Sequence, residues 1–176
     1  MSDVCRNCGS WNVGADGLCA ACRGRASADA VMRQLYLITG AIFAWVFLYG
    51  LVFFLLEQLG ALAPLRVPLP GAVPWLLLLI GVVPVAASGV VNARAAAAPT
   101  PQAIVRLVVI SAALAEFPSM LGFLGSVLTS APVFIALGIG LSLVAFVAIG
   151  AYMPALARRV TELTAEESED TGDSQP

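Results

Sequence analysis

All four cysteines of this 176-residue chain lie near its N-terminus, in two pairs with the spacing C-x-x-C. The pairs are Cys5 with Cys8 and Cys19 with Cys22, and ten residues separate them. Two such knuckles can fold back on each other and place four thiolates tetrahedrally around one Zn²⁺. Gly9 follows the first pair, where a knuckle needs a tight turn. We therefore predict a zinc site with these cysteines as ligands and no coordination position open for catalysis.

The stretch CRNCGSWNVGADGLCAACRG, residues 5–24, is similar to the short zinc ribbons at the ends of many prokaryotic proteins. The similarity rests on the knuckle spacing, on the glycine after the first pair and on Leu18 before the third cysteine. It implies a small N-terminal zinc ribbon. Because so short a head has few apolar residues to bury, we expect metal binding to supply most of its folding free energy.

Zinc ribbons occur in nucleic-acid-binding and in protein-binding settings, so the resemblance does not choose between these partners. The positive charges of the head, Arg6, Arg23 and Arg25, are partly balanced by Asp3 and Asp16. The basic residues form no continuous stripe. Without a cluster of positive charge, contacts to phosphates would contribute little affinity. We expect the head to dock a protein and not a nucleic acid.

Glu116 is the one charged residue in a run that is otherwise apolar from Leu107 to Leu128. It lies roughly 14 Å into a hydrocarbon core of about 30 Å, where an ionised carboxylate is costly. Two interpretations stay open: a carboxylate that carries a proton or an ion, or a glutamate that hydrogen-bonds a neighbouring helix. Candidate partners for the second are Ser111, Ser119 and Ser142. Small residues beside the acid recur at steps of three and four and favour close helix packing: Ala112, Ala115, Ser119, Gly122 and Ser126.

The segment from Ala115 to Leu124 resembles the carboxylate helix of the proteolipid c subunits of rotary ATPases. In that family a glutamate or aspartate precedes a glycine by six positions, as Glu116 precedes Gly122 here. The resemblance implies that Glu116 takes the place of the ion-carrying carboxylate. The first apolar run has the same offset between Ala44 and Gly50, 72 residues earlier. This spacing suggests two helical hairpins that arose by duplication.

The elements that position these residues are apolar. Hydrophobic residues make up 60% of the chain and charged residues 11%, and the mean hydropathy is +0.92, whereas soluble domains carry about 25% charged residues. Four runs are long enough to cross a bilayer, at 35–56, 72–91, 104–128 and 131–153. Barrel strands would be alternating runs of about ten residues, so continuous runs predict helices. We expect an all-α membrane protein with four transmembrane helices, arranged as two hairpins.

The chain has no lysine, and its nine basic residues are all arginine. Eight of them precede the first run, flank the loop between the second and third runs, or follow the fourth: Arg6, Arg23, Arg25, Arg33, Arg94, Arg106, Arg158 and Arg159. Only Arg66 lies in the loop between the first and second runs. By the positive-inside rule, this asymmetry places both termini on the cytoplasmic side of the cell membrane. An even number of spans agrees with that topology.

Two other roles for the cysteines are weaker. Disulfides need an oxidising compartment, whereas the arginines place the head in the cytoplasm, where thiols stay reduced. A thioredoxin-like motif needs a βαβ context that so small a head cannot provide. The chain also has no histidine, no phosphate-binding glycine loop and no evident pair of nucleophile and base. We therefore expect no enzymatic activity and identify no small-molecule substrate.

We divide the chain into a zinc ribbon (1–26), a linker (27–34), a transmembrane domain (35–157) and an acidic tail (158–176). The tail is small and charged, so we expect it to be disordered. The interpretation we favour is a non-enzymatic membrane protein whose zinc head docks or assembles with a protein partner or with further copies of the chain. The alternative is a small proton- or ion-coupled membrane subunit with Glu116 as its titrating carboxylate.

Overall fold

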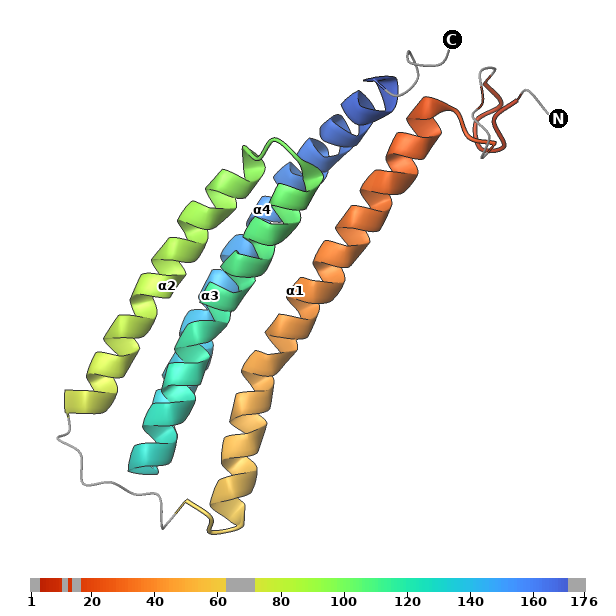
Figure 1. Cartoon of the computed structure of the whole chain (residues 1–176). Helices are drawn as coiled ribbons and strands as arrows, with labels where there is room; N and C mark the ends of the chain where they lie inside the picture. The colour runs from red at the N-terminus through yellow and green to blue at the C-terminus, as the bar shows by residue number, and fades with distance from the viewer. Residues whose placement is uncertain (1–3, 11–12, 14–16, 63–71, 171–176) are drawn as a thin grey trace.

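The fold is all-α, with helices α1 (Ala20–Gln58), α2 (Ala72–Ala96), α3 (Pro101–Thr129) and α4 (Val133–Asp170) (Figure 1). The computed structural model describes residues 4–10, 13, 17–62 and 72–170, and these contain no β-strand. All four helices are long and apolar enough to span a membrane. The prediction of an all-α protein with four membrane-spanning helices is therefore confirmed.

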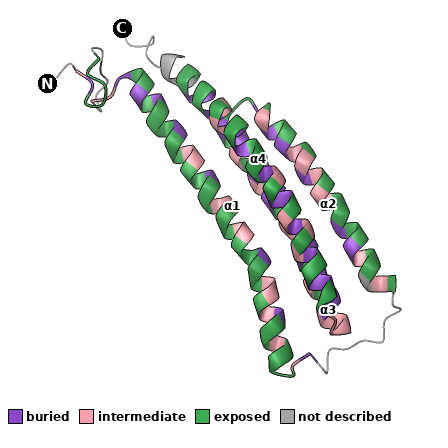
Figure 2. Cartoon of the chain, turned by 180° about the vertical axis from the view of Figure 1, so that it is seen from behind, coloured by how far each residue is buried: buried purple, intermediate pink, exposed green. Residues whose placement is uncertain are grey.

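Helices α3 and α4 form the centre of the bundle, and α1 and α2 lie on opposite sides of this pair (Figures 1 and 2). Both outer helices pack against α3 and α4, but they do not pack along each other. The expected second hairpin of α3 with α4 is present, whereas α1 and α2 are consecutive without being neighbours. Thirteen residues separate these two helices in the sequence, and a chain of that length can reach across the bundle.

Helices α3 and α4 approach each other closely at Gly122 and Gly138. A Cβ added to Gly122 would lie 2.5 Å from the carbonyl oxygen of Phe134, and one added to Gly138 would lie 2.5 Å from that of Pro118. The backbones can approach this closely only because neither residue has a side chain. The five small residues predicted as a packing seam on α3 are all buried: Ala112, Ala115, Ser119, Gly122 and Ser126.

Polar side chains close the exposed ends of the central helices. The Thr100 side chain accepts a hydrogen bond from the Ala103 backbone N–H at 3.2 Å, and Pro101 follows as the first helical residue of α3. Both are standard signals for a helix start. Ser126 on α3 accepts a hydrogen bond from the Ile135 N–H at 2.8 Å, which satisfies a donor in the first turn of α4.

Helices α1 and α4 continue well beyond the other two as an antiparallel pair, which we call the stalk (residues 20–34 and 154–170). With 39 and 38 residues, they are about 57 Å long, nearly twice the thickness of a hydrocarbon core of about 30 Å. The stalk buries residues at steps of three and four on both helices, the spacing of a helical packing stripe: Gly24 and Ala28 on α1, and Leu156, Val160 and Leu163 on α4.

Three boundaries expected from the sequence differ in the structure. The zinc ribbon and the linker overlap α1, which begins at Ala20, and the residues from 158 to 170 continue α4 instead of being disordered. Pro154, where the fourth span was expected to end, lies inside that helix. Packing against α1 explains the continuation, because Val160 and Leu163 are 0% and 7% exposed there. Residues 171–176 lie outside the described part of the chain.

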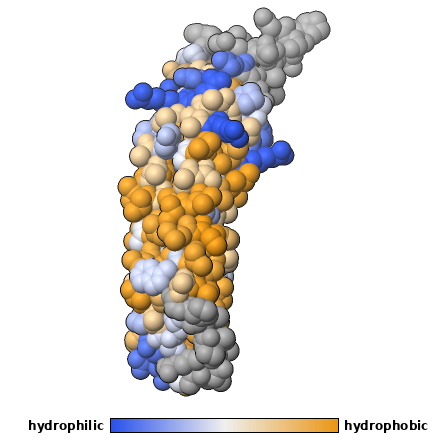
Figure 3. Space-filling model, turned by 90° about the vertical axis from the view of Figure 1, so that its left-hand side faces the viewer, coloured by the Kyte–Doolittle hydropathy of each residue, from blue (hydrophilic) through white to orange (hydrophobic). Residues whose placement is uncertain are grey.

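On the face shown in Figure 3, apolar side chains form a broad band across the middle of the molecule, and hydrophilic ones lie at both ends, most of them at the end where both termini lie. Within the band the exposed side chains are large and apolar, with Val147 at 74% and Leu37 at 66% exposed. Lipid as the surrounding solvent accounts for this surface. The arginines of the helices all lie toward the end where both termini lie: Arg23, Arg25, Arg33, Arg94, Arg106, Arg158 and Arg159. Arg66, Asp3 and Asp16 lie outside the described residues.

Candidate metal centre

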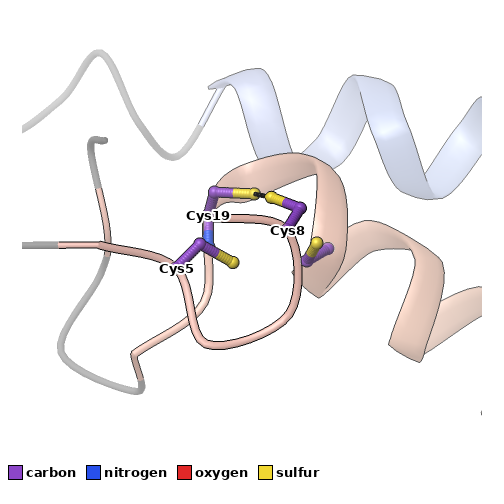
Figure 4. A group of neighbouring side chains, drawn as sticks. Cys5, Cys8 and Cys19 are labelled. Atoms are coloured by element: carbon purple, nitrogen blue, oxygen red, sulfur yellow. Dashed lines mark hydrogen bonds between the residues drawn. The ribbon is translucent and has the colours of Figure 1, made fainter. Parts of the chain in front are cut away.

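The four cysteine sulfurs converge on one point at the free end of the stalk (Figure 4). The Sγ atoms of Cys5, Cys8, Cys19 and Cys22 all lie within 4.8 Å of one another. A tetrahedral site with Zn–S bonds of about 2.3 Å has sulfurs about 3.8 Å apart, so a small contraction would close the cluster on a metal. All four cysteines are free thiols, and the sulfurs of Cys8 and Cys19 are 3.5 Å apart. This separation is far longer than a disulfide bond of about 2.05 Å.

The first pair of cysteines lies in a tight turn. The Gly9 N–H donates to the Cys5 carbonyl at 2.9 Å, and the Cys5 N–H donates to the Ser10 carbonyl at 2.8 Å. Gly9 has a φ of 74°, a left-handed conformation that a side chain would strain. The glycine therefore lets the chain reverse and return the first knuckle toward the second.

The second pair of cysteines lies at the start of α1. Cys19 is the N-cap residue, with extended backbone, and Cys22 follows in the first helical turn. A helix N-terminus carries a partial positive charge that favours thiolates. The head is thus a knuckle packed on a helix end, with no strand among its described residues. Any metal held here also fixes the first turn of α1.

Most of the cluster is shielded from solvent. Cys5, Cys19 and Cys22 are 3–8% exposed and pack with Val13 and Leu18, whereas Cys8 is exposed. Several N–H donors reach the sulfurs: among them, the Cys19 backbone nitrogen lies 3.3 Å from Cys5 Sγ, and the Asn7 side-chain nitrogen lies 3.6 Å from Cys22 Sγ. Such outer hydrogen bonds orient ligands and stabilise thiolate charge. Asn7 could not be recognised from the sequence, because an asparagine between two cysteines carries no distinctive signal.

The thiols differ in how readily they ionise. Backbone N–H groups of Cys19, Asn7 and Cys8 hydrogen-bond the Cys5 thiolate and lower its pKa from 9.0 to about 6. A hydrogen bond from the Ser10 side chain is the largest cause that lowers the pKa of Cys19. The neighbouring sulfurs of Cys19 and Cys8 raise the pKa of Cys22 to about 12. The cluster thus favours thiolate at some positions and resists a further negative charge unless a cation is present.

Glu116 lies near the middle of α3, away from the metal centre. Its Oε1 accepts a hydrogen bond from the Tyr49 hydroxyl of α1 at 3.0 Å, and both side chains are half-buried. The Tyr49 ring also packs on Phe123 of α3, with the ring centroids 5.6 Å apart. The carboxylate therefore faces a neighbouring helix. Tyr49 could not be recognised from the sequence as the partner of Glu116, because 67 residues separate the two.

The three serines named as candidate partners bond backbone groups and not the carboxylate. Ser119 Oγ donates to the Glu116 carbonyl oxygen at 2.7 Å, and Ser142 Oγ lies 3.5 Å from the same oxygen and accepts from the Ser119 N–H at 3.1 Å. Ser111 Oγ donates to the Ser88 carbonyl of α2 at 3.2 Å. The Ser111 hydroxyl thus joins α3 to α2 and the Ser142 hydroxyl joins α4 to α3, so these two contribute to helix packing.

Comparisons with known proteins return no match: no protein-family model, no curated protein and no solved structure matches this chain. The similarities to zinc ribbons and to proteolipid c subunits therefore rest on the quoted residues alone. The firm conclusions are four helices that can cross a membrane and four cysteines that can hold a metal ion.

Proposed function

We propose that this protein is a non-enzymatic, multi-pass membrane protein whose cysteine head binds Zn²⁺ and docks a protein partner at the cytoplasmic face of the cell membrane. The observation that carries the proposal is the convergence of four thiol sulfurs within 4.8 Å at the end of the stalk. A set of four sulfur ligands with tetrahedral spacing suits Zn²⁺ and leaves no position for substrate. Arginines at the same end of the bundle support a cytoplasmic placement of the head, where thiols stay reduced.

The position of the head supports docking. The stalk extends the two long helices by about 22–26 Å beyond their membrane-spanning parts, so the head is held away from the lipid surface. Its exposed residues are small or polar and include Arg6, Asn7 and Ser10. These residues present hydrogen-bonding groups and little concentrated charge, which favours a protein partner over a nucleic acid.

For Glu116 we propose a structural role. The hydrogen bond from Tyr49 satisfies one carboxyl oxygen within the bundle, which a packing function requires. The proton- or ion-coupled alternative has no comparable contact in its favour.

Elemental analysis tests whether the cysteine head binds Zn²⁺. The full-length protein, made under reducing conditions and purified in detergent, should contain one zinc per chain, and Cys22→Ser should lose it. Ser27→Ala, a change at an exposed position on the stalk, should keep the metal and serves as the matched control. Zinc no higher than in Cys22→Ser, or iron in place of zinc, would contradict the assignment.

Site-specific crosslinking tests the docking. A photoreactive residue at exposed Ala20, in the first turn of α1, should give a discrete crosslinked product in native membranes that disappears with Cys5→Ser. The same probe at Ala30, exposed but about 15 Å further along α1, should not give it. The captured partner should then bind purified zinc-loaded protein. Equal products from both positions, or no product from either, would rule out docking by the head.

A further inference from the structure

An apolar groove of about 400 Å³ runs between α1 and α4 on the surface of the bundle. Its walls include Tyr36 and Thr39 on α1 and Val147 and Met153 on α4. The groove exists because both helices place a glycine along it, Gly40 and Gly150, and a Cβ at either position would meet no atom within 4 Å. Its volume lies within the range of ligand pockets, roughly 300–1,000 Å³.

The groove lies at the depth of one lipid leaflet. On α4 its lining extends from Leu143 to Met153, a rise of about 15 Å, which is half of a hydrocarbon core of about 30 Å. The groove lies in the half of the hydrocarbon core that is next to the stalk, at the end of the bundle that carries the arginines. An occupant of this groove is therefore surrounded by acyl chains and has its outer end at the headgroup level.

Two arginines continue the faces that line the groove. Arg33 precedes Tyr36 by three residues and Gly40 by seven, and Arg158 follows Val147 by eleven residues, about three helical turns. Both arginines are exposed, and neither forms an ion pair within the described part of the chain. Arg159, in contrast, lies 3.2 Å from Glu162. Positive charge without an acidic partner thus lies at the headgroup end of an apolar groove.

We infer that the groove between α1 and α4 binds one acyl chain of an anionic phospholipid, whose phosphate group lies between Arg33 and Arg158. The apolar walls match a hydrocarbon chain, and the guanidinium groups match a phosphate that carries net negative charge. The Tyr36 ring, 58% exposed, lies at the interfacial depth that tyrosines favour. Each arginine near a lipid surface favours anionic headgroups by about fivefold, so two should give a preference of tenfold or more. This inference does not depend on the metal or on docking by the head.

Native mass spectrometry of the full-length protein, released from detergent with added lipid, tests the inference. The probes are phosphatidylglycerol and phosphatidylcholine with identical acyl chains. Wild-type protein should bind phosphatidylglycerol at least tenfold more tightly. Arg33→Gln combined with Arg158→Gln should reduce its affinity to that of phosphatidylcholine, and Gly150→Leu, which fills the groove, should weaken both lipids at least tenfold.

Matched controls separate the groove from general surface effects. Arg25→Gln removes an exposed arginine about 12 Å further out on α1. Gly140→Leu adds a side chain to α4 at another position where a Cβ meets no atom within 4 Å. Neither control should change lipid binding. Equal affinities of wild-type protein for the two lipids would overturn the inference, as would wild-type binding by Gly150→Leu. A change of oligomeric state in Gly150→Leu without loss of lipid would assign the groove to a second copy of the chain and would also overturn it.

Discussion

At the scale of single residues, the contact between Tyr49 and Glu116 shows how the bundle accommodates its one mid-span acid. The hydroxyl donates to Oε1 at 3.0 Å across the gap between α1 and α3. Hydrogen bonds between membrane helices contribute about 0.6 kcal/mol on average and at most about 1.7 kcal/mol. The pair is thus a modest link between α1 and the central helix α3.

Tyr49→Phe should lower the free energy of unfolding in detergent by about 0.6 kcal/mol, because the carboxyl group loses its donor. The same change in a Glu116→Leu background should have no effect, since the acceptor is already absent. Tyr152→Phe, at a position near the end of the apolar band, should be neutral.

Glu116→Gln keeps an acceptor oxygen and should retain wild-type stability. Proton flux in proteoliposomes that depends on Glu116 would contradict a purely structural role.

At the scale of elements, the contact between α3 and α4 depends on the absence of side chains at two positions. Gly122 and Gly138 lie opposite each other, with 3.0 Å between the added Cβ of one and the Cα of the other. Serine hydroxyls around this crossing bond backbone groups on the facing helix. The pair is therefore held by close van der Waals packing together with a few hydrogen bonds.

Gly138→Ala should lower the free energy of unfolding by about 1–3 kcal/mol, the usual cost of overpacking, because its Cβ would meet the Pro118 carbonyl oxygen. Gly140→Ala, two residues along the same helix, has open space at its Cβ and should be neutral or slightly stabilising. Reversible unfolding in detergent followed by circular dichroism measures both. Equal effects of the two changes would mean that the crossing is looser than described.

At the scale of the whole molecule, the metal centre and the stalk are structurally coupled. Cys19 and Cys22 belong to the first turn of α1, and α1 packs on α4 along the stalk. A metal that fixes these cysteines therefore also holds the end of a helix that projects from the membrane. Loss of the metal should loosen the stalk and leave the membrane-embedded core unchanged.

Hydrogen exchange of the protein in lipid nanodiscs tests this coupling. Removal of zinc with a chelator should increase exchange in residues 20–34, because the first turn of α1 is no longer fixed, and should leave α3 unchanged. Cys22→Ser without chelator should reproduce the pattern. A uniform increase over all four helices, or no change in the stalk, would contradict the coupling.

The four apolar helices, the cysteine cluster and the packing seam on α3 could all be predicted from the residues. Each is a local property, since apolar runs, knuckle spacing and small residues at helical steps act through neighbours in the chain. Only the tertiary structure decided that Tyr49 faces Glu116, that Gly122 meets Gly138 and that α1 and α2 are not neighbours. It also decided that residues 158–170 are helical, because their apolar positions are stabilised by α1, more than a hundred residues away. These contacts join residues of different helices that lie far apart in the sequence. Composition and local spacing therefore do not predict which residues meet.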